Sequence, residues 1–139
     1  MRGLHHNQLF LLDYDRLCKT PGHEGAVLIQ DGHRAGVLTR IPLSEPFNVR
    51  SSDLFLEFND AAARIYPQAP PTRVFVTSKL RFEGRRLKDH HRNTSLAELG
   101  FAWLCFSRID WDPNKDDLVT MIDVVWLRLH ALTPDDLED

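Results

Sequence analysis

Apolar and charged residues alternate most regularly in the stretch from residue 79 to residue 89. Leu80 and Phe82 alternate with charged neighbours, which is typical of a strand with one buried face. Gly84 then supplies the backbone freedom that a tight turn needs, and Leu87 follows as the apolar residue of a returning strand. The pattern predicts a strand, a glycine turn and a short second strand.

Apolar residues have the spacing of a helix, and not that of a strand, in the earlier segment 55–65. Four apolar residues follow at intervals of three, four and three positions, namely Phe55, Phe58, Ala62 and Ile65. This spacing places them on one face of a helix. The side chains of residues 51–53 can cap its first turn, and Pro67 would end it. We expect a helix here, preceded by a short strand at residues 47–50.

Two arrangements of the first hairpin remain open. Residues 26–30 and 36–43 are rich in β-forming side chains, and Asp31-Gly32 between them is a strong hairpin signal. Either these two segments form the first hairpin, or 36–43 pairs with 46–50 and residues 26–30 are an added strand. The second arrangement gives the better spacing between strand and helix.

The remaining segments are less decisive. Residues 9–13 fit a strand or one helical turn, whereas 73–82 and 102–109 are expected to be strands. Residues 118–132 fit both a strand and a helix, and their β-branched content favours a strand that pairs with 102–109. The acidic tail, residues 133–139, is expected to be frayed.

The order Leu-x-Phe-x-Gly-x-x-Leu-x-Asp at residues 80–89, followed by Leu-x-x-Leu-x-Phe at 96–101, resembles the second half of a ubiquitin-like domain. The resemblance implies an α+β protein with the β-grasp fold, in which a mixed sheet wraps over one main helix. It covers residues 36–109. Residues 1–35 are then an N-terminal extension with a candidate added strand. Residues 110–139 form a C-terminal strand or helix and the acidic tail, packed on the same domain.

This chain departs from the ubiquitin-like pattern at three places. Conjugated modifiers of the family end in Gly-Gly, whereas the sequence here ends in Leu-Glu-Asp. The apolar residue at the centre of the family's recognition face is matched by Arg81, and its chain-linkage lysine by Arg85. We therefore expect neither conjugation nor binding to the usual ubiquitin receptors.

Composition bounds the class of protein. A chain of 139 residues with a net charge of −3 suits one domain with a core, and it is no polycation built for nucleic acid. No apolar run approaches the roughly 18 residues of a membrane span, and the first residues lack a secretory signal pattern. Cys18 and Cys105 are more often reduced in such a chain. We expect an intracellular protein, cytoplasmic or nuclear.

No catalytic or metal-binding pattern stands out. The adjacent pairs His5-His6 and His90-His91 lack partners at zinc-ligand spacing, and the aspartates of 110–117 lack the glycine and glutamate of a calcium-binding EF-hand loop. No glycine-rich phosphate loop occurs. We expect no enzymatic activity, no cofactor and no metal.

The charge is distributed unevenly along the chain, with an excess of cations in residues 79–92. Six cations, Lys79, Arg81, Arg85, Arg86, Lys88 and Arg92, accompany only two acidic residues in the fourteen residues 79–92. The segment is either a solvated strand edge or a basic patch that meets an acidic protein surface or a nucleic-acid backbone. Trp111, between two aspartates in a predicted loop, is the candidate aromatic contact.

These features favour a non-enzymatic, ubiquitin-like subunit that docks a protein partner with an acidic surface, through the sheet surface or an edge strand, within a larger assembly. The alternative is a nucleic-acid-associated peripheral subunit of a ribonucleoprotein that uses the basic segment 79–92. No membrane partner is expected.

Overall fold

The computed structural model describes residues 4–31, 34–91, 94, 96–105 and 110–139. The helices are α1 (Gln8–Cys18), α2 (Asp60–Ile65) and α3 (Leu118–Leu129). The strands are β1 (Val27–Asp31), β2 (Arg34–Pro42), β3 (Ser51–Phe58), β4 (Arg73–Thr77), β5 (His90–His91) and β6 (Phe101–Leu104). Short 3-10 helices lie at Leu4–His6, Ala97–Leu99 and Pro134–Asp136. Within these ranges no helix has the length and apolar character to cross a membrane.

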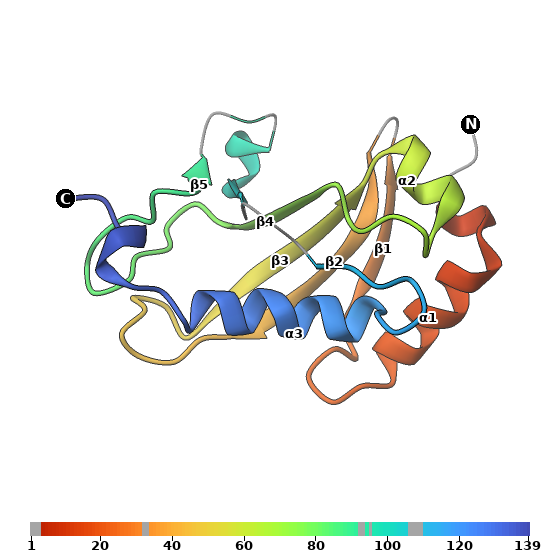
Figure 1. The fold of residues 1–139 in the computed structure, drawn as a ribbon, viewed down its shortest axis with the longest axis horizontal. Coiled ribbons are helices and arrows are strands. Elements are labelled where there is room, and N and C mark those ends of the chain that lie inside the picture. The colour runs from red at the N-terminus through yellow and green to blue at the C-terminus, as the bar shows by residue number, and fades with distance from the viewer. Residues whose placement is uncertain (1–3, 32–33, 92–93, 95, 106–109) are drawn as a thin grey trace.

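The described strands form one six-stranded sheet in the order β1-β2-β3-β4-β6-β5 (Figure 1). Each neighbouring pair is antiparallel. The α+β class is therefore confirmed, but the mixed sheet of a β-grasp is not shown. Parallel neighbours need a crossover connection, and here β1, β2, β3 and β4 follow one another as neighbours in chain order.

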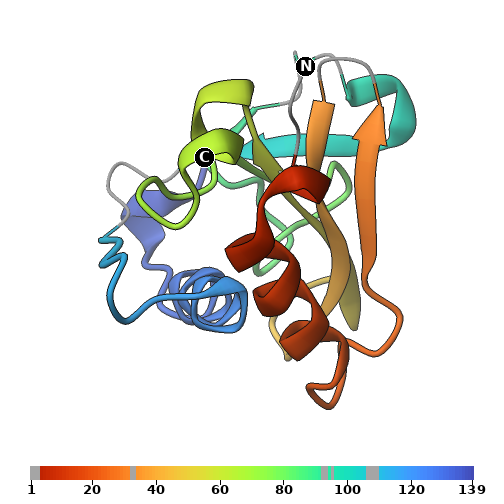
Figure 2. The same cartoon turned by 90° about the vertical axis from the view of Figure 1, so that its right-hand side faces the viewer.

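Helices α1 and α3 lie on the same side of the sheet, and the 3-10 turn at Ala97–Leu99 lies on the other side (Figure 2). Strand β2 shows how the sequence produces these two layers. Val37 and Ile41 are buried towards the helices, whereas Leu38 and Arg40 belong to the opposite face and are more exposed. We call the face towards α1 and α3 the core face and the opposite face the outer face.

Residues 118–129 form a helix, so the favoured strand is wrong and the helical alternative is confirmed. Leu118, Ile122, Val125 and Leu129 are buried at helical spacing, and a capping box between Asp117 and Thr120 starts the helix. The β-branched residues lower helix propensity only slightly. Burial of the apolar stripe outweighs that preference, since most helical stability in proteins comes from packing.

The predicted helix at residues 51–65 is also wrong in its first half. Residues 51–58 are strand β3, and the helix begins only after Asn59, whose side chain caps the amide of Ala62. Strand β3 is buried on both faces, with Leu54, Leu56 and Phe58 on the core face and Phe55 on the outer face. A strand that is apolar on both faces loses its alternation, and the apolar residues then also fit helical spacing.

Of the two arrangements left open for the first hairpin, the pairing of 26–30 with 36–43 is the one observed, as β1 and β2. Strand β2 pairs with β3, at residues 51–58, and not with a strand at 46–50, so the arrangement that had the better predicted spacing is wrong. Residues 9–13 lie in α1. The strand expected at 102–109 is present as β6, and residues 106–109 lie outside the described residues.

The stretch 79–89 contains a turn but no continuous strand. Strand β4 already ends at Thr77, and only an isolated bridge joins Phe82 to Arg85. Glu83 and Gly84 have positive φ angles of 53° and 77°, as a tight turn requires. Leu80 and Phe82 are buried as the alternation predicts, and Phe82 packs edge-on against Phe47 with the ring centroids 5.1 Å apart.

Candidate protein-binding surfaces

The outer face of the sheet carries a second, smaller apolar cluster. Phe55 of β3 and Phe75 of β4 are buried there with their ring centroids 6.1 Å apart. Leu96, from the segment before the Ala97–Leu99 turn, is buried against them. This part of the outer face is therefore covered by the chain itself, and Leu96 is one of the described residues that cover it.

Glycine at position 36 determines how Phe55 lies on this face. A Cβ atom at Gly36 would stand 2.1 Å from the carbonyl oxygen of Leu56 and 2.8 Å from the Phe55 ring. Only a residue without a side chain can occupy this position unless its neighbours shift. Gly36 thus lets the ring lie close over β2.

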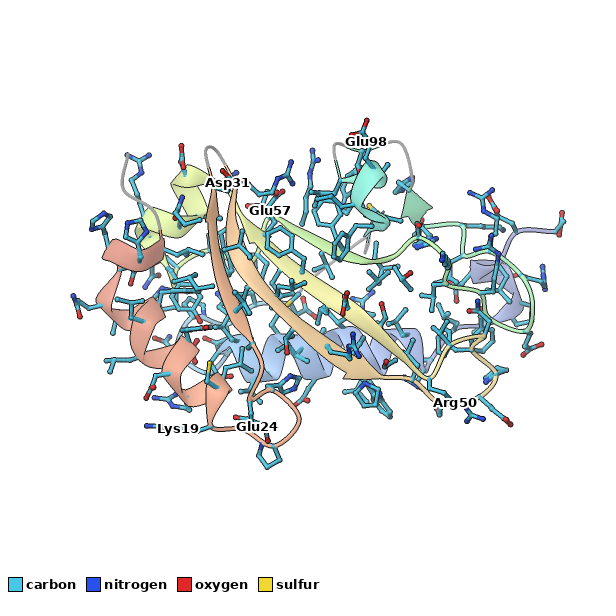
Figure 3. All side chains as sticks on the ribbon, turned by 180° about the vertical axis from the view of Figure 1, so that it is seen from behind. Lys19, Glu24, Asp31, Arg50, Glu57 and Glu98 are labelled. Carbon is cyan, nitrogen blue, oxygen red and sulfur yellow. The ribbon has the colours of Figure 1, made fainter. Side chains whose placement is uncertain are left out.

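The other half of the outer face is less covered. Val27 is 48 % exposed on the edge strand β1, and its cross-strand partner Leu38 is half-buried. Val27 and Leu38 also line an open hollow of about 340 Å³ whose rim includes Gly22, Gly25 and the Arg40–Asp53 pair. His23 fixes the neighbouring loop through a 2.8 Å hydrogen bond with Thr39. Figure 3 views this face, with β1 and β2 nearest the reader.

Charged residues around the outer face are paired with each other. Arg34 and Glu57 form a 2.6 Å ion pair between β2 and β3, and Arg40 faces Asp53 across the same strands at 3.3 Å. Arg73 lies 4.7 Å from the centroid of the Trp103 ring. The apolar centre therefore has a polar rim whose paired charges largely cancel, as in many protein–protein interfaces.

Sequence reasoning missed this face because it assigned Phe55 to a helix stripe. The signal that could have shown it is the run Leu54-Phe55-Leu56, which is apolar at consecutive positions. In a strand, consecutive side chains point to opposite faces. Such a run therefore requires two apolar layers, one on each side of the sheet.

The predicted basic residues lie around the turn at Glu83 and Gly84. Lys79, Arg86 and Lys88 are exposed, whereas Arg81 and Arg85 are half-buried, and Arg92 lies outside the described residues. The backbone of residues 79–81 is held by Asn48, which accepts from the Arg81 amide at 2.6 Å and donates to the Lys79 carbonyl at 2.8 Å. The cluster is thus built on a fixed loop rather than on a strand edge.

Part of this basic cluster binds the acidic tail of the same chain. Arg86 pairs with Glu138 at 3.3 Å, and Arg85 donates through Nε to the Glu138 carbonyl at 2.8 Å. Leu137 is 2 % exposed and forms an isolated bridge with Leu87. The expectation of a frayed tail is therefore wrong, since main-chain pairing and a buried leucine hold it. We call the surface of residues 85–88 that contacts the tail the tail groove.

Trp111 lies in an irregular segment as expected, but its side chain is only half-exposed. Its indole N–H donates to the Pro67 carbonyl at 2.7 Å, and its ring lies 6.2 Å from that of Tyr66. The structure therefore gives Trp111 a role in holding residues 110–112 to the loop after α2. Its proposed contact with a partner stays a prediction.

A buried carboxyl group joins the three helices. Asp13 of α1 accepts hydrogen bonds from the Tyr66 hydroxyl after α2 and from the Leu118 amide at the start of α3. Burial raises the pKa of Asp13 above its ordinary value, although these two hydrogen bonds act against the rise. Burial and the neighbouring Asp13 also raise the pKa of Tyr66. No local sequence pattern indicates this junction, because the partners of Asp13 lie 53 and 105 residues away along the chain.

In the part of the chain that the structure describes, no group of three or more histidine, cysteine or acidic side chains could hold a metal ion. Comparisons with protein-family models, with curated proteins and with solved structures found no match. The ubiquitin-like resemblance therefore stays a prediction.

Proposed function

We propose that this protein is a non-enzymatic binding domain that docks a protein partner on the outer face of its sheet, as a subunit of a larger assembly. The observation that carries the proposal is the division of that face. One half is covered by Leu96 of the chain itself, and the other half presents Val27 and Leu38 beside an open hollow. Uncovered apolar surface with a polar rim is characteristic of interaction sites.

The covered half indicates what kind of group fits the uncovered half. Leu96 is 6 % exposed against the Phe55 and Phe75 rings. A partner that places an aliphatic side chain in the hollow against Val27 and Leu38 would extend the same layer. Charge would add little affinity, because the nearby cations Arg34 and Arg40 already have carboxylate partners.

Strand β1 offers a further means of recognition. It stands at one end of the strand order, and β2 is its partner in the sheet. An edge strand can pair with an extended segment of another chain through main-chain hydrogen bonds. The outer-face side chains Val27 and Ile29 would then select the partner's side chains.

The ubiquitin-like assignment of residues 36–109 forms part of the proposal as a prediction. Buried Leu80, Phe82 and Leu87 agree with the apolar positions of the family pattern. The antiparallel sheet does not supply the mixed arrangement of the β-grasp. The proposed function therefore does not depend on this assignment, since fold alone does not establish function.

Site-specific photo-crosslinking tests the proposal in cells of the source organism. A photoreactive residue is placed at Val27 on the outer face or, as the matched control, at Leu12 on α1, which is 63 % exposed. We expect a discrete cross-linked protein from position 27 that is lost when Leu38 is replaced by Asp. Equal cross-linking from both positions, or none from position 27, would refute the outer-face site.

A second candidate function is nucleic-acid binding by the basic segment. Lys79 and Lys88 are exposed and pair with no carboxylate of the described chain. This function predicts retention on RNA or DNA that weakens steeply with salt and is reduced by combined Arg81→Ala, Arg85→Ala and Arg86→Ala substitutions. Retention that is unchanged by those substitutions would exclude the segment as the binding site.

A further inference from the structure

We propose that the tail groove is a binding site for an acidic, leucine-containing segment of a partner protein, and that residues 134–139 occupy it as an internal competitor. The site is separate from the outer face, so this inference does not depend on the function proposed above. It develops the expectation of an acidic partner for the basic segment. The tail itself shows how such a ligand would be held.

Main-chain contacts supply a part of the binding that any extended segment could reproduce. The Lys88 amide donates to the Asp136 carbonyl at 2.9 Å, and the Glu138 amide donates to the Arg86 carbonyl at 2.8 Å. These two bonds flank the antiparallel bridge between Leu87 and Leu137. This is the β-strand addition by which many domains recognise peptides.

Side chains supply the selectivity. Leu137 is 2 % exposed and belongs to the main hydrophobic cluster, so the central ligand position requires an apolar residue of similar size. Glu138, the next residue, pairs with Arg86 at 3.3 Å, and Asp139 lies 3.8 Å from Arg85. The chemistry of the tail therefore defines the ligand as a segment in which a leucine is followed by acidic residues.

The basic cluster exceeds what the tail neutralises. The tail pairs with Arg85 and Arg86, while Lys79 and Lys88 are exposed and have no described carboxylate partner. A partner segment with additional acidic residues could reach these lysines. Such charges accelerate association at low salt more than they increase equilibrium affinity.

A partner segment can exchange with the tail because it would form the same main-chain hydrogen bonds and bury its own leucine in place of Leu137. The charged contacts of the tail add little to its hold, because the side chains of Arg86 and Glu138 are 44 % and 45 % exposed. The tail nevertheless competes well, because it is tethered to α3 and acts at an effective concentration on the order of millimolar. A free ligand can bind only molecules whose tail is released. Its apparent affinity is therefore the intrinsic affinity multiplied by the fraction of molecules in which the tail is free.

The test uses the full chain and a fluorescent peptide with the sequence of residues 133–139. Leu137→Ala weakens the hold of the internal tail, while Asp135→Asn, in an exposed residue beside it, serves as the control. We expect the Leu137→Ala chain to bind the peptide at least about tenfold more tightly than the wild type, because the competitor is removed. The Asp135→Asn chain should match the wild type. Salt, or Arg86→Glu in the same chain, should weaken binding.

Hydrogen exchange of the Lys88 amide independently measures whether the tail or the peptide occupies the tail groove. Its partner is the Asp136 carbonyl, so protection should fall in Leu137→Ala and return when the peptide is added. A peptide in which leucine is replaced by alanine should not restore it. Glu138→Ala, which keeps Leu137 in place, should tighten peptide binding several-fold and gives a second test if Leu137→Ala does not fold.

Either of two results would overturn the proposal. One is an unchanged peptide affinity in both tail variants together with an exposed Lys88 amide that the peptide does not protect. The other is preferential binding of an RNA or DNA oligonucleotide by Leu137→Ala, with no binding of the peptide. That second result would assign the released cluster to nucleic acid.

Discussion

The outer face and the tail groove differ in what is available to a partner. On the outer face the apolar surface near Val27 is open, and the nearby cations Arg34 and Arg40 are already paired with Glu57 and Asp53. In the tail groove the apolar position is filled by Leu137, and cations remain beside it. The outer face near Val27 is thus uncovered, whereas the tail groove is covered by the C-terminal tail of the same chain.

This difference separates two contributions to binding. Apolar burial mainly determines how long a complex lasts, whereas exposed charge mainly determines how fast it forms. The outer face offers the first contribution and the basic cluster the second. A protein partner that used both surfaces would be steered by the cluster and retained by the outer face.

The largest expected effect is the loss of stability when the buried Leu137, rather than the exposed Val27, is truncated. Leu137→Ala should lower the free energy of unfolding by about 2–5 kcal/mol, since a buried leucine leaves a cavity. Val27→Ala, at a position 48 % exposed, should cost less than about 1 kcal/mol. Urea denaturation of both variants measures the difference. Equal losses would show that the tail is held no more firmly than an exposed strand residue.

A second substitution tests the packing beneath the outer face. Gly36→Ala should destabilise the protein by about 1–3 kcal/mol, because the new methyl group would meet the Leu56 carbonyl and the Phe55 ring. Gly25→Ala is the matched control, since a Cβ there has open space. Thermal unfolding compares the two. If Gly36→Ala were as stable as Gly25→Ala, the close approach of Phe55 to β2 would be wrong.

The buried carboxyl of Asp13 should produce a pH dependence that neither surface produces. Burial raises its pKa in the folded state above the ordinary 3.8. The folded protein then binds more protons than the unfolded chain between the two pKa values, so stability falls as pH rises through that window. Asp13→Asn, which keeps an acceptor oxygen without the charge, should remove this slope.

The measurement is the unfolding free energy of wild type and Asp13→Asn between pH 4 and pH 8, a window set by the ordinary aspartate pKa. The difference between the two proteins should shift in favour of Asp13→Asn as pH rises. A difference that shifts in favour of the wild type would contradict the assigned direction of the pKa.

The smallest expected effect concerns the exposed ion pair of the groove. Arg86→Glu should reduce stability by less than about 1 kcal/mol and less still at high salt, because the pair is exposed and screened. Combining it with Glu138→Arg restores opposite charges and should recover part of the loss. A double-mutant cycle at two salt concentrations checks both statements. No recovery at low salt would mean that Arg86 and Glu138 do not interact in solution.

Both candidate surfaces were only partly predictable. The alternation around Leu80 and Phe82 correctly indicated buried residues beside a turn, and the excess of cations in 79–92 followed directly from the sequence. The outer face was missed because Phe55 fitted a helical spacing as well as a strand. The tail was misjudged because its charge suggests solvation, whereas Leu137 is buried against the core.

The sequence by itself determined the local chemistry: the hairpin signal at Asp31-Gly32, the positive charge around Gly84, and the apolar residues that had to be buried somewhere. Only the tertiary structure decided where. Local patterns such as residues 118–129 fit two secondary structures, and packing of Leu118, Ile122 and Val125 in the core selected the helix. Pairings over long sequence separations, such as Leu87 with Leu137 and Asp13 with Leu118, depend on how distant segments meet. No local periodicity contains that information, because periodicity reports which face of an element is apolar but not what covers it.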